Sequence, residues 1–201
     1  MSVKSLIYCS KAKPYLFGHY VGFDTKYQYD LTICKQVFSY HKNVLNGKIV
    51  ASFDCEKVEE IVYNGWWNCY ADNDSIEGNY FDNDLACLNE EELKNYLGDK
   101  KGYAIHISNL QVFDEPKELS DYLVFDGDYT DTDNWKTNQY APQNMKNVYE
   151  FCSSNDVISP KRTLKKCVLI SIKPEWVAKI LNGEKTIEVR KSVVNALKGL
   201  I

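Results

Sequence analysis

Residues 167–191 constrain the fold most tightly, because their hydrophobic pattern changes twice within one short segment. The stretch CVLISI (167–172) is apolar and rich in β-branched residues, which predicts a buried strand. Pro174 fits the first position of a helix, where its missing N–H costs nothing, and an apolar face at helical spacing follows it. Asn182-Gly183 then ends the helix. From residue 186 the period becomes two, so the segment is predicted to be strand, helix and strand.

The second strand of this unit carries a row of polar side chains. Ile187 and Val189 share one face, which we expect to lie against the core. Thr186, Glu188 and Arg190 share the other face, which places a hydroxyl, a carboxylate and a guanidinium in line. Two interpretations of the charged pair stay open: a surface or cross-strand ion pair that contributes less than about 1 kcal/mol, or a site that binds a ligand.

The same row carries a resemblance to a known family. Gly183, Lys185, Glu188 and Arg190 fit a G-x-K-x-x-E-x-R pattern, and the sequence IKPEW of Ile172 to Trp176 precedes it. This segment resembles the opening strand, helix and strand of an ASCH domain, whose architecture is similar to that of PUA-type RNA-binding barrels. In that family the segment is N-terminal, whereas here it lies at the end of the chain.

Other stretches of the chain resemble later parts of the same family. They are Leu6 to Lys11 (LIYCSK), Gly47 to Ile61, Tyr103 to Leu110, Asp114 to Leu119 (DEPKEL) and Ala141 to Glu150 (APQNMKNVYE). The resemblance covers about residues 1–150 and 167–191, in the opposite order. It implies an α+β fold: a small PUA-like or ASCH β-barrel with short flanking helices and a circularly permuted strand order.

This resemblance divides the chain into three parts. It implies that residues 1–150 form an ASCH-like barrel that lacks its first strand-helix-strand, and that residues 167–201 supply that unit. Residues 151–166 are rich in Ser, Asn, Pro and Lys, which is the composition of a linker. Domain termini often lie close together, so a linker can join them. A monomer completed by its own residues 167–191 and a segment-swapped dimer both stay open, because an unclosed barrel leaves bare sheet edges.

Local signals predict several more elements. Residues 3–9, 48–55 and 102–107 are predicted strands. Asn89 and Glu92 have the spacing of a capping box, which predicts a helix over Asn89 to Leu97.

Two polar stretches have the composition of loops. Residues 65–83 combine Trp66, Trp67 and several Tyr and Phe residues with Asp and Asn, so these aromatic side chains either pack on the barrel or form a binding flap. Residues 123–139 are rich in Asp but lack the Gly and the closing Glu of an EF-hand, which predicts a solvated loop.

The cysteines and histidines argue against metal and disulfide chemistry. The 7 Cys form no C-x-x-C pair and the chain has 3 His, which favours reduced thiols in a cytoplasmic protein over disulfides or zinc. We expect His106 to be a hydrogen-bonded core or wall residue, because no second metal ligand lies at a useful spacing. No run approaches the roughly 18 apolar residues of a membrane span. We therefore expect no metal, no cofactor, no signal peptide and no membrane partner.

Charge is distributed unevenly along the chain. Residues 161–201 carry a net charge of +7 and residues 1–160 a net charge of −11, for a total of −4. One basic element on an acidic body fits a local anion site, although the lysines also fit a solubilising tail. The acidic body favours a short ligand over long, non-specific nucleic acid.

The candidate site combines the polar row with residues that the resemblance places near it. The candidate ligand-binding residues are Lys173, Lys185, Thr186, Glu188, Arg190, Tyr8, Lys11 and Gln143, and the candidate catalytic residues are Lys185 and Glu188. Lys and Arg suit a phosphate or the polar edge of a base. Tyr8, Trp66 and Trp67 suit either base stacking or core packing.

Three functions follow from this pattern. The first is a non-enzymatic module that binds short single-stranded RNA or a small nucleotide-like ligand. The second is a hydrolase acting on a modified nucleoside or RNA, since some ASCH proteins are amidohydrolases for N4-acetylcytidine and others are reported as ribonucleases. Lys185 matches the Lys of the amidohydrolase type, but Glu188 stands where that type has Thr, so Lys185 itself would act as base or nucleophile. The third is a non-catalytic structural or interaction protein, in which internal ion pairs occupy the polar row.

Overall fold

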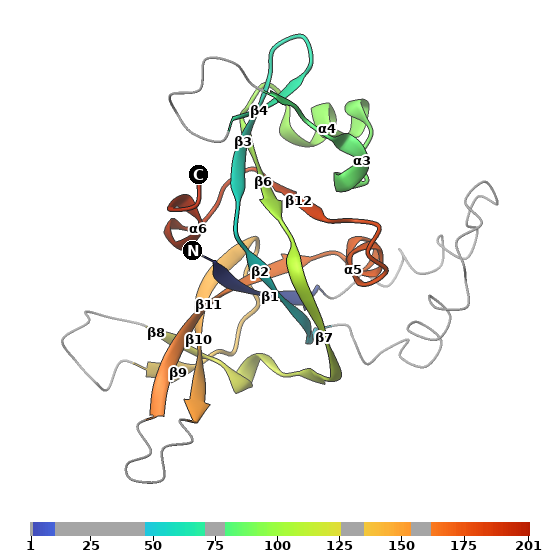
Figure 1. Ribbon diagram of the computed structural model, residues 1–201. Helices are drawn as coiled ribbons and strands as arrows, with labels where there is room; N and C mark the ends of the chain where they lie inside the picture. Colours follow the sequence, from blue (N-terminus) through green and yellow to red (C-terminus); the bar gives the residue numbers. More distant parts are fainter. Residues whose placement is uncertain (1, 11–46, 71–78, 126–134, 154–161) are drawn as a thin grey trace.

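The computed structural model of the chain describes residues 2–10, 47–70, 79–125, 135–153 and 162–201 (Figure 1). The strands are β1 (Val3–Cys9), β2 (Ile49–Cys55), β3 (Val58–Tyr63), β4 (Trp67–Tyr70), β5 (Asn79–Tyr80), β6 (Gly102–His106), β7 (Ser108–Lys117), β8 (Leu123–Phe125), β9 (Trp135–Thr137), β10 (Met145–Ser153), β11 (Arg162–Ile172) and β12 (Ile187–Arg190). The helices are α3 (Asn83–Ala86), α4 (Glu90–Leu97), α5 (Pro174–Leu181), α6 (Asn195–Lys198) and the 3₁₀ helix η1 (Leu119–Asp121). The α+β class predicted from the sequence is confirmed.

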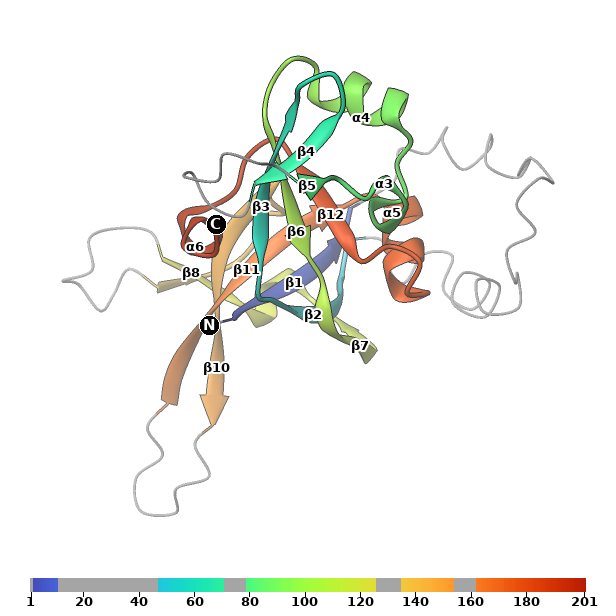
Figure 2. The same cartoon turned by 45° about the horizontal axis from the view of Figure 1, so that its top comes forward.

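The strands form two sheets that share two continuous stretches of chain. A 7-stranded sheet has the order β7-β2-β1-β11-β10-β8-β9, and a 5-stranded sheet has the order β12-β6-β3-β4-β5. β2 runs into β3 and β6 runs into β7, so both stretches pass from one sheet to the other (Figure 2). No closed barrel is detected among the described strands, and the PUA-like barrel stays a prediction.

The C-terminal segment lies at the centre of the larger sheet of its own chain. β11 pairs in parallel with β1, where Leu169 lies opposite Leu6, and antiparallel with β10, where Cys167 lies opposite Val148. β12 pairs instead with β6 in the smaller sheet. Residues 167–191 thus connect the two sheets, and α5 lies between β11 and β12 along the chain.

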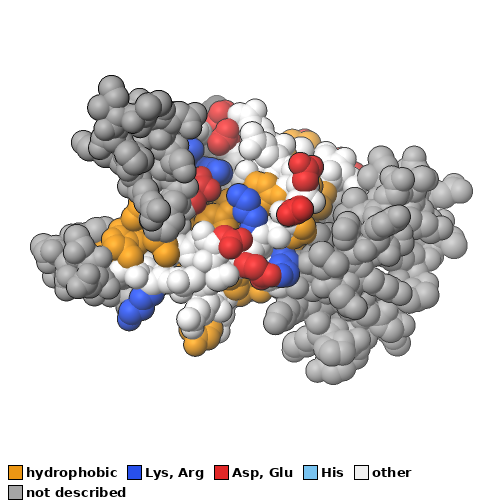
Figure 3. Space-filling model, turned by 90° about the horizontal axis from the view of Figure 1, so that it is seen from below, with side chains coloured by type: hydrophobic (Ala, Val, Ile, Leu, Met, Phe, Trp, Pro, Cys, Tyr) orange, Lys and Arg blue, Asp and Glu red, His pale blue; other side chains and the backbone are white. Residues whose placement is uncertain are grey.

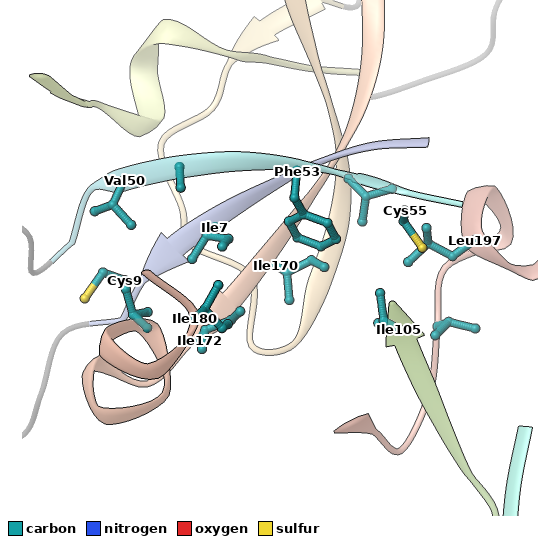
Figure 4. Close-up of a cluster of buried hydrophobic side chains, with 14 of the residues drawn as sticks. Ile7, Cys9, Val50, Phe53, Cys55, Ile105, Ile170, Ile172, Ile180 and Leu197 are labelled. Atoms are coloured by element: carbon teal, nitrogen blue, oxygen red, sulfur yellow. The ribbon is translucent and has the colours of Figure 1, made fainter. Parts of the chain in front are cut away.

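Three apolar clusters hold these layers together. The largest lies between the sheets and includes Phe53 of β2, Ile170 of β11 and Val177 of α5 (Figure 4). A second cluster joins β12, β6 and β3 to helices α3 and α4, and a third contains Leu6 and Tyr8 of β1. β1 therefore contributes to a core on each face, which explains why its sequence is an almost continuous apolar run.

The local signals in the sequence correctly predicted both longer helices. Asn89 is the N-cap of α4: its Oδ1 accepts a hydrogen bond from the Glu92 backbone N–H at 2.8 Å, and Glu92 Oε2 accepts one from the Asn89 backbone N–H at 2.9 Å. Pro174 opens α5. Gly183, just after the helix, has φ = +77°, a conformation that strains residues with a side chain.

Three polar stretches contain more strand than their composition predicts. The expected loop over residues 65–83 includes β4 and β5, and the expected loop over residues 123–139 includes β8 and β9. β10 and β11 also extend into the expected linker, residues 151–166. In each case pairing with a neighbouring strand supplies the backbone hydrogen bonds. β4, β5, β8 and β9 have two to four residues each, which is too few for alternation to distinguish a strand from a loop.

Candidate functional site

Glu188 lies between two cations. Its Oε1 is 2.9 Å from Arg190 Nε, and its Oε2 is 3.4 Å from Lys185 Nζ. The side chains of Lys185, Glu188 and Arg190 are only 2%, 8% and 11% exposed. The ion pair anticipated as one interpretation of the row therefore exists, but it includes a third residue and lies inside the protein. We call Lys185, Glu188 and Arg190 the charged cluster.

Contacts from distant parts of the chain position the charged cluster. Lys185 Nζ donates a hydrogen bond of 2.6 Å to the backbone carbonyl of Ala86, at the end of α3. Arg190 Nη2 donates one of 2.5 Å to the carbonyl of Ser171 in β11, and Nη1 donates one of 3.2 Å to Asn144 Oδ1, just before β10. The cluster is thus held by both sheets and by α3.

The charged cluster has an excess of one positive charge, because two cations face a single carboxylate. Lys185 Nζ also lies 5.2 Å from the centroid of the Trp176 ring, and Lys179 Nζ lies 5.0 Å from it. A cation over an indole face is stabilised by the ring quadrupole, which replaces part of its lost hydration. Arg190 has five N–H donors, more than its three contacts occupy. The cluster is therefore suited to a group that is anionic or rich in hydrogen-bond acceptors.

Burial lowers the pKa of the Lys185 ammonium group, and the neighbouring Glu188 carboxylate only partly offsets this effect. Arg190 acts in the same direction as burial. A lysine whose pKa is lowered by burial next to a charge partner is a recurring feature of functional sites. Lys185 is thus easier to deprotonate than an ordinary lysine.

The alternation predicted for β12 is confirmed. Ile187 and Val189 are buried in the cluster that α3 and α4 cover. The opposite face is largely covered too, because Arg190 bonds to Ser171 of β11 and to Asn144 just before β10, and the buried Glu188 pairs with Arg190. The two-residue period identified both faces, but it contained no information about what covers the polar one.

Lys173 and Thr186 lie near the ends of the strand-helix-strand unit. Lys173 is the N-cap residue of α5, and its side chain is 73% exposed, with Nζ 4.0 Å from Glu175 Oε1. Thr186 is partly buried, and its backbone bonds to Leu85 O and Ile107 N at 2.9 Å each. Lys173 is thus free to meet a ligand at the surface, whereas Thr186 fixes the start of β12.

The remaining candidates do not join the charged cluster. Tyr8 is buried in the third apolar cluster, so the base-stacking role proposed for it is not supported. Along β1 its side chain points away from Ile7, which faces the largest core. Gln143 is exposed beside Asn144, and Lys11 lies outside the described residues. Of the two tryptophans considered for stacking, Trp67 is buried and Trp66 is exposed.

The sequence did not reveal Asn144 and Trp176 as parts of the site. Asn144 accepts a hydrogen bond from Arg190 and donates one of 3.1 Å to Ser192 Oγ, so it connects the start of β10 to the end of β12. Trp176 appeared only as the last residue of the IKPEW segment, with no role at the site assigned to it. Asn144 had no local signal, because its partners Arg190 and Ser192 are distant in sequence.

A second charged group lies where β2 bends into β3. Glu59 is buried, with Oε1 2.8 Å from Lys57 Nζ and Oε2 2.5 Å from His106 Nε2. The expected hydrogen bonding of His106 is therefore confirmed. Across the described ranges, no group of three or more His, Cys, Asp and Glu side chains is placed to hold a metal ion.

We expect Glu59 to make the protein less stable in acid. Burial raises the pKa of its carboxyl, but hydrogen bonds from Lys57 and His106 outweigh this and hold the pKa below the ordinary value of 4.5. When the pKa of a carboxyl is lower in the folded than in the unfolded state, the ionised group stabilises the protein at pH values above the unfolded-state pKa. This contribution is lost as the pH falls through the folded-state pKa. This contribution is measured by urea unfolding of the wild type and of Glu59→Gln, at neutral pH and at pH values below 4.5. The stability difference between them should shrink as pH falls; a constant difference would contradict the assignment.

Comparisons with protein-family models, with curated proteins and with solved structures gave no match to this chain. In the part of the chain that the structure describes, no helix is both long enough and apolar enough to cross a membrane. The functional argument therefore rests on the site itself.

Proposed function

We propose that the protein is a non-enzymatic binding module that recognises short single-stranded RNA or a small nucleotide-like ligand at the charged cluster. The observation that carries this proposal is the buried excess of one positive charge at Lys185, Glu188 and Arg190. An arginine guanidinium binds a phosphate or the edge of a base through parallel hydrogen bonds. Glu188, which orients Arg190, is also able to accept a hydrogen bond from the amino group of a base.

Charge favours a short ligand. On the face shown in Figure 3, acidic and basic side chains of the described residues lie close to one another. A long phosphate backbone binds best along an extended basic surface. Because the net charge of the chain is −4, one local cation site suits a nucleotide or a few linked nucleotides.

We also propose that the fold is a permuted ASCH-like one, related to PUA-type barrels. β10 and β11 are antiparallel neighbours, so a chain that began at β11 and ended at β10 would have adjacent termini. The present ends are close as well: Val3 and Ile201 pack against the same apolar cluster, and both views show the termini near each other (Figures 1 and 2). Both features are what circular permutation requires.

The lowered pKa of Lys185 favours a second candidate function, a hydrolase acting on a modified nucleoside or RNA. A neutral lysine amine is a base or a nucleophile, and Glu188 is placed to accept or return its proton. In this version of the site Arg190 would bind the substrate rather than take part in the reaction.

Calorimetric titration of the purified protein with nucleotides, short RNAs and modified nucleosides tests the first proposal. Arg190→Lys keeps the charge but removes the planar fork, so we expect affinity to fall about 10- to 100-fold, the value of one hydrogen bond to a charged group. Lys198→Ala, an exposed change on α6, is the control. Equal affinity in wild type and Arg190→Lys would show that the ligand binds elsewhere.

Mass spectrometry of the same mixtures separates binding from catalysis. Saturable binding without a product supports the recognition module. A product whose formation is lost in Lys185→Gln supports the hydrolase, provided that thermal unfolding shows the variant to be folded. Neither binding nor product would favour a structural role for the charged cluster.

A further inference from the structure

Large aromatic side chains are exposed at one end of the smaller sheet. Trp66, in the turn of the β3–β4 hairpin, and Tyr80 of β5 are 58% and 69% exposed. Tyr63 is 37% exposed, but it lies opposite Trp67 in the ladder and therefore on the other face of the sheet. This end of the molecule lies opposite the β10–β11 hairpin in Figure 1. Exposed apolar surface concentrated in one place usually marks an interaction site.

Trp66 is held in a fixed orientation although it is exposed. Its Nε1 donates a hydrogen bond of 2.9 Å to Asn68 Oδ1, and Asn68 Nδ2 donates one of 3.0 Å to the Trp66 carbonyl. Asn68 is buried. A ring that is already ordered loses little conformational entropy when it binds a partner.

Tyr80 lies on the same face of the sheet. It is directly opposite Asn68 in the β4–β5 ladder, and residues that oppose each other in a ladder share a face. The Trp66 indole reaches the Asn68 side chain on this face, while Trp67 and Cys69 point to the buried opposite face. Trp66, Asn68 and Tyr80 thus form one surface, which we call the aromatic platform.

The surroundings of the platform favour flat, polar-edged ligands over an aliphatic protein surface. The exposed large apolar residues described in this sheet are all aromatic, and the exposed aliphatic ones, Leu85 and Val112, lie on α3 and β7. An exposed lysine, Lys101, lies just before β6, and its Nζ is 2.7 Å from Oε2 of Glu60 on β3, the strand that pairs with β4. Aromatic side chains on a sheet face with lysine nearby are the usual means of binding unpaired bases.

We propose that the aromatic platform stacks unpaired bases of single-stranded nucleic acid. This inference rests on the proposed function for the class of ligand, but it assigns a second contact surface, separate from the charged cluster. Because Lys101 is paired with Glu60, stacking rather than phosphate contacts supplies the affinity, and salt should weaken binding only slightly.

The test is the fluorescence anisotropy of labelled oligouridylate and oligoadenylate with the full chain. Trp66→Ala and Tyr80→Ala should each weaken binding about tenfold, the value of one stacked base. Trp66→Phe keeps a ring and should retain most of the affinity. Tyr140→Ala is the matched control, because Tyr140 is 77% exposed but lies outside the platform. Circular dichroism verifies that each variant is folded.

The outcomes distinguish this inference from the proposed function. Unchanged affinity in both alanine variants, or equal binding of a duplex of the same sequence, would overturn stacking at the platform. Self-association that Trp66→Ala abolishes, with no effect on oligonucleotides, would overturn it in favour of a protein partner. If the platform variants weaken oligonucleotide binding while Arg190→Lys leaves mononucleotide binding unchanged, the platform stands and the charged cluster fails as the ligand site.

Discussion

Replacing Glu188 with alanine should lower the free energy of unfolding by about 3–5 kcal/mol, the usual cost of removing one partner from a buried ion pair. The carboxylate separates Lys185 and Arg190, whose side chains are only 2% and 11% exposed. Without it, two like charges remain in a region of low dielectric constant. Their hydrogen bonds to the carbonyls of Ala86 and Ser171 neutralise neither charge.

Urea denaturation at neutral pH measures this effect, and the chain offers a matched control. Glu175 is an exposed glutamate whose Oε1 lies 4.0 Å from Lys173 Nζ, so Glu175→Ala should cost less than about 1 kcal/mol. Glu188→Gln keeps an acceptor oxygen and should fall between the two. A loss in Glu188→Ala no larger than in Glu175→Ala would mean that water reaches the charged cluster.

Replacing Phe53 with alanine should cost about 3–5 kcal/mol, because a large buried ring leaves a cavity that the surrounding core fills only partly. Phe53 is fully buried on β2 and points into the largest apolar cluster (Figure 4). That cluster joins both sheets to α5 and α6, so the ring contributes to the contact that aligns them. Phe53→Leu leaves less empty volume and should cost less.

The same denaturation measurement tests this prediction, with Val112→Ala as control. Val112 is exposed on β7, the strand that pairs with β2, so its truncation should change stability by less than about 0.5 kcal/mol. If Phe53→Ala and Val112→Ala had similar effects, the two sheets would not depend on a shared core.

Local chemistry was sufficient to predict the helices with clear start and stop signals and the strands with apolar runs. The Asn89 capping box, Pro174 at the start of α5 and Gly183 after its end each act within one helical turn. The strands over residues 3–9 and 48–55 were also predicted closely, because each contains a short apolar stretch of strand length. Such signals depend only on neighbours in sequence, and they are therefore visible before folding.

Short strands and side-chain roles were harder to predict. β4 has a two-residue alternation, but its four residues are too few to distinguish it from a loop rich in aromatics. The sequence suited Tyr8 equally to base stacking and to core packing. Its position opposite Ser171, in a cluster with Leu6 and Val148, shows that it packs in the core. In both cases the deciding partner comes from another part of the chain.

The sequence by itself determined that β12 has an apolar and a polar face, since alternation follows from strand geometry. Only the tertiary structure decided that the polar face is buried and which groups meet it. Lys185 bonds to a carbonyl 99 residues away, and Arg190 bonds to an amide 46 residues away. No local pattern encodes such contacts, because they arise when β11 enters the larger sheet and α3 covers the smaller one.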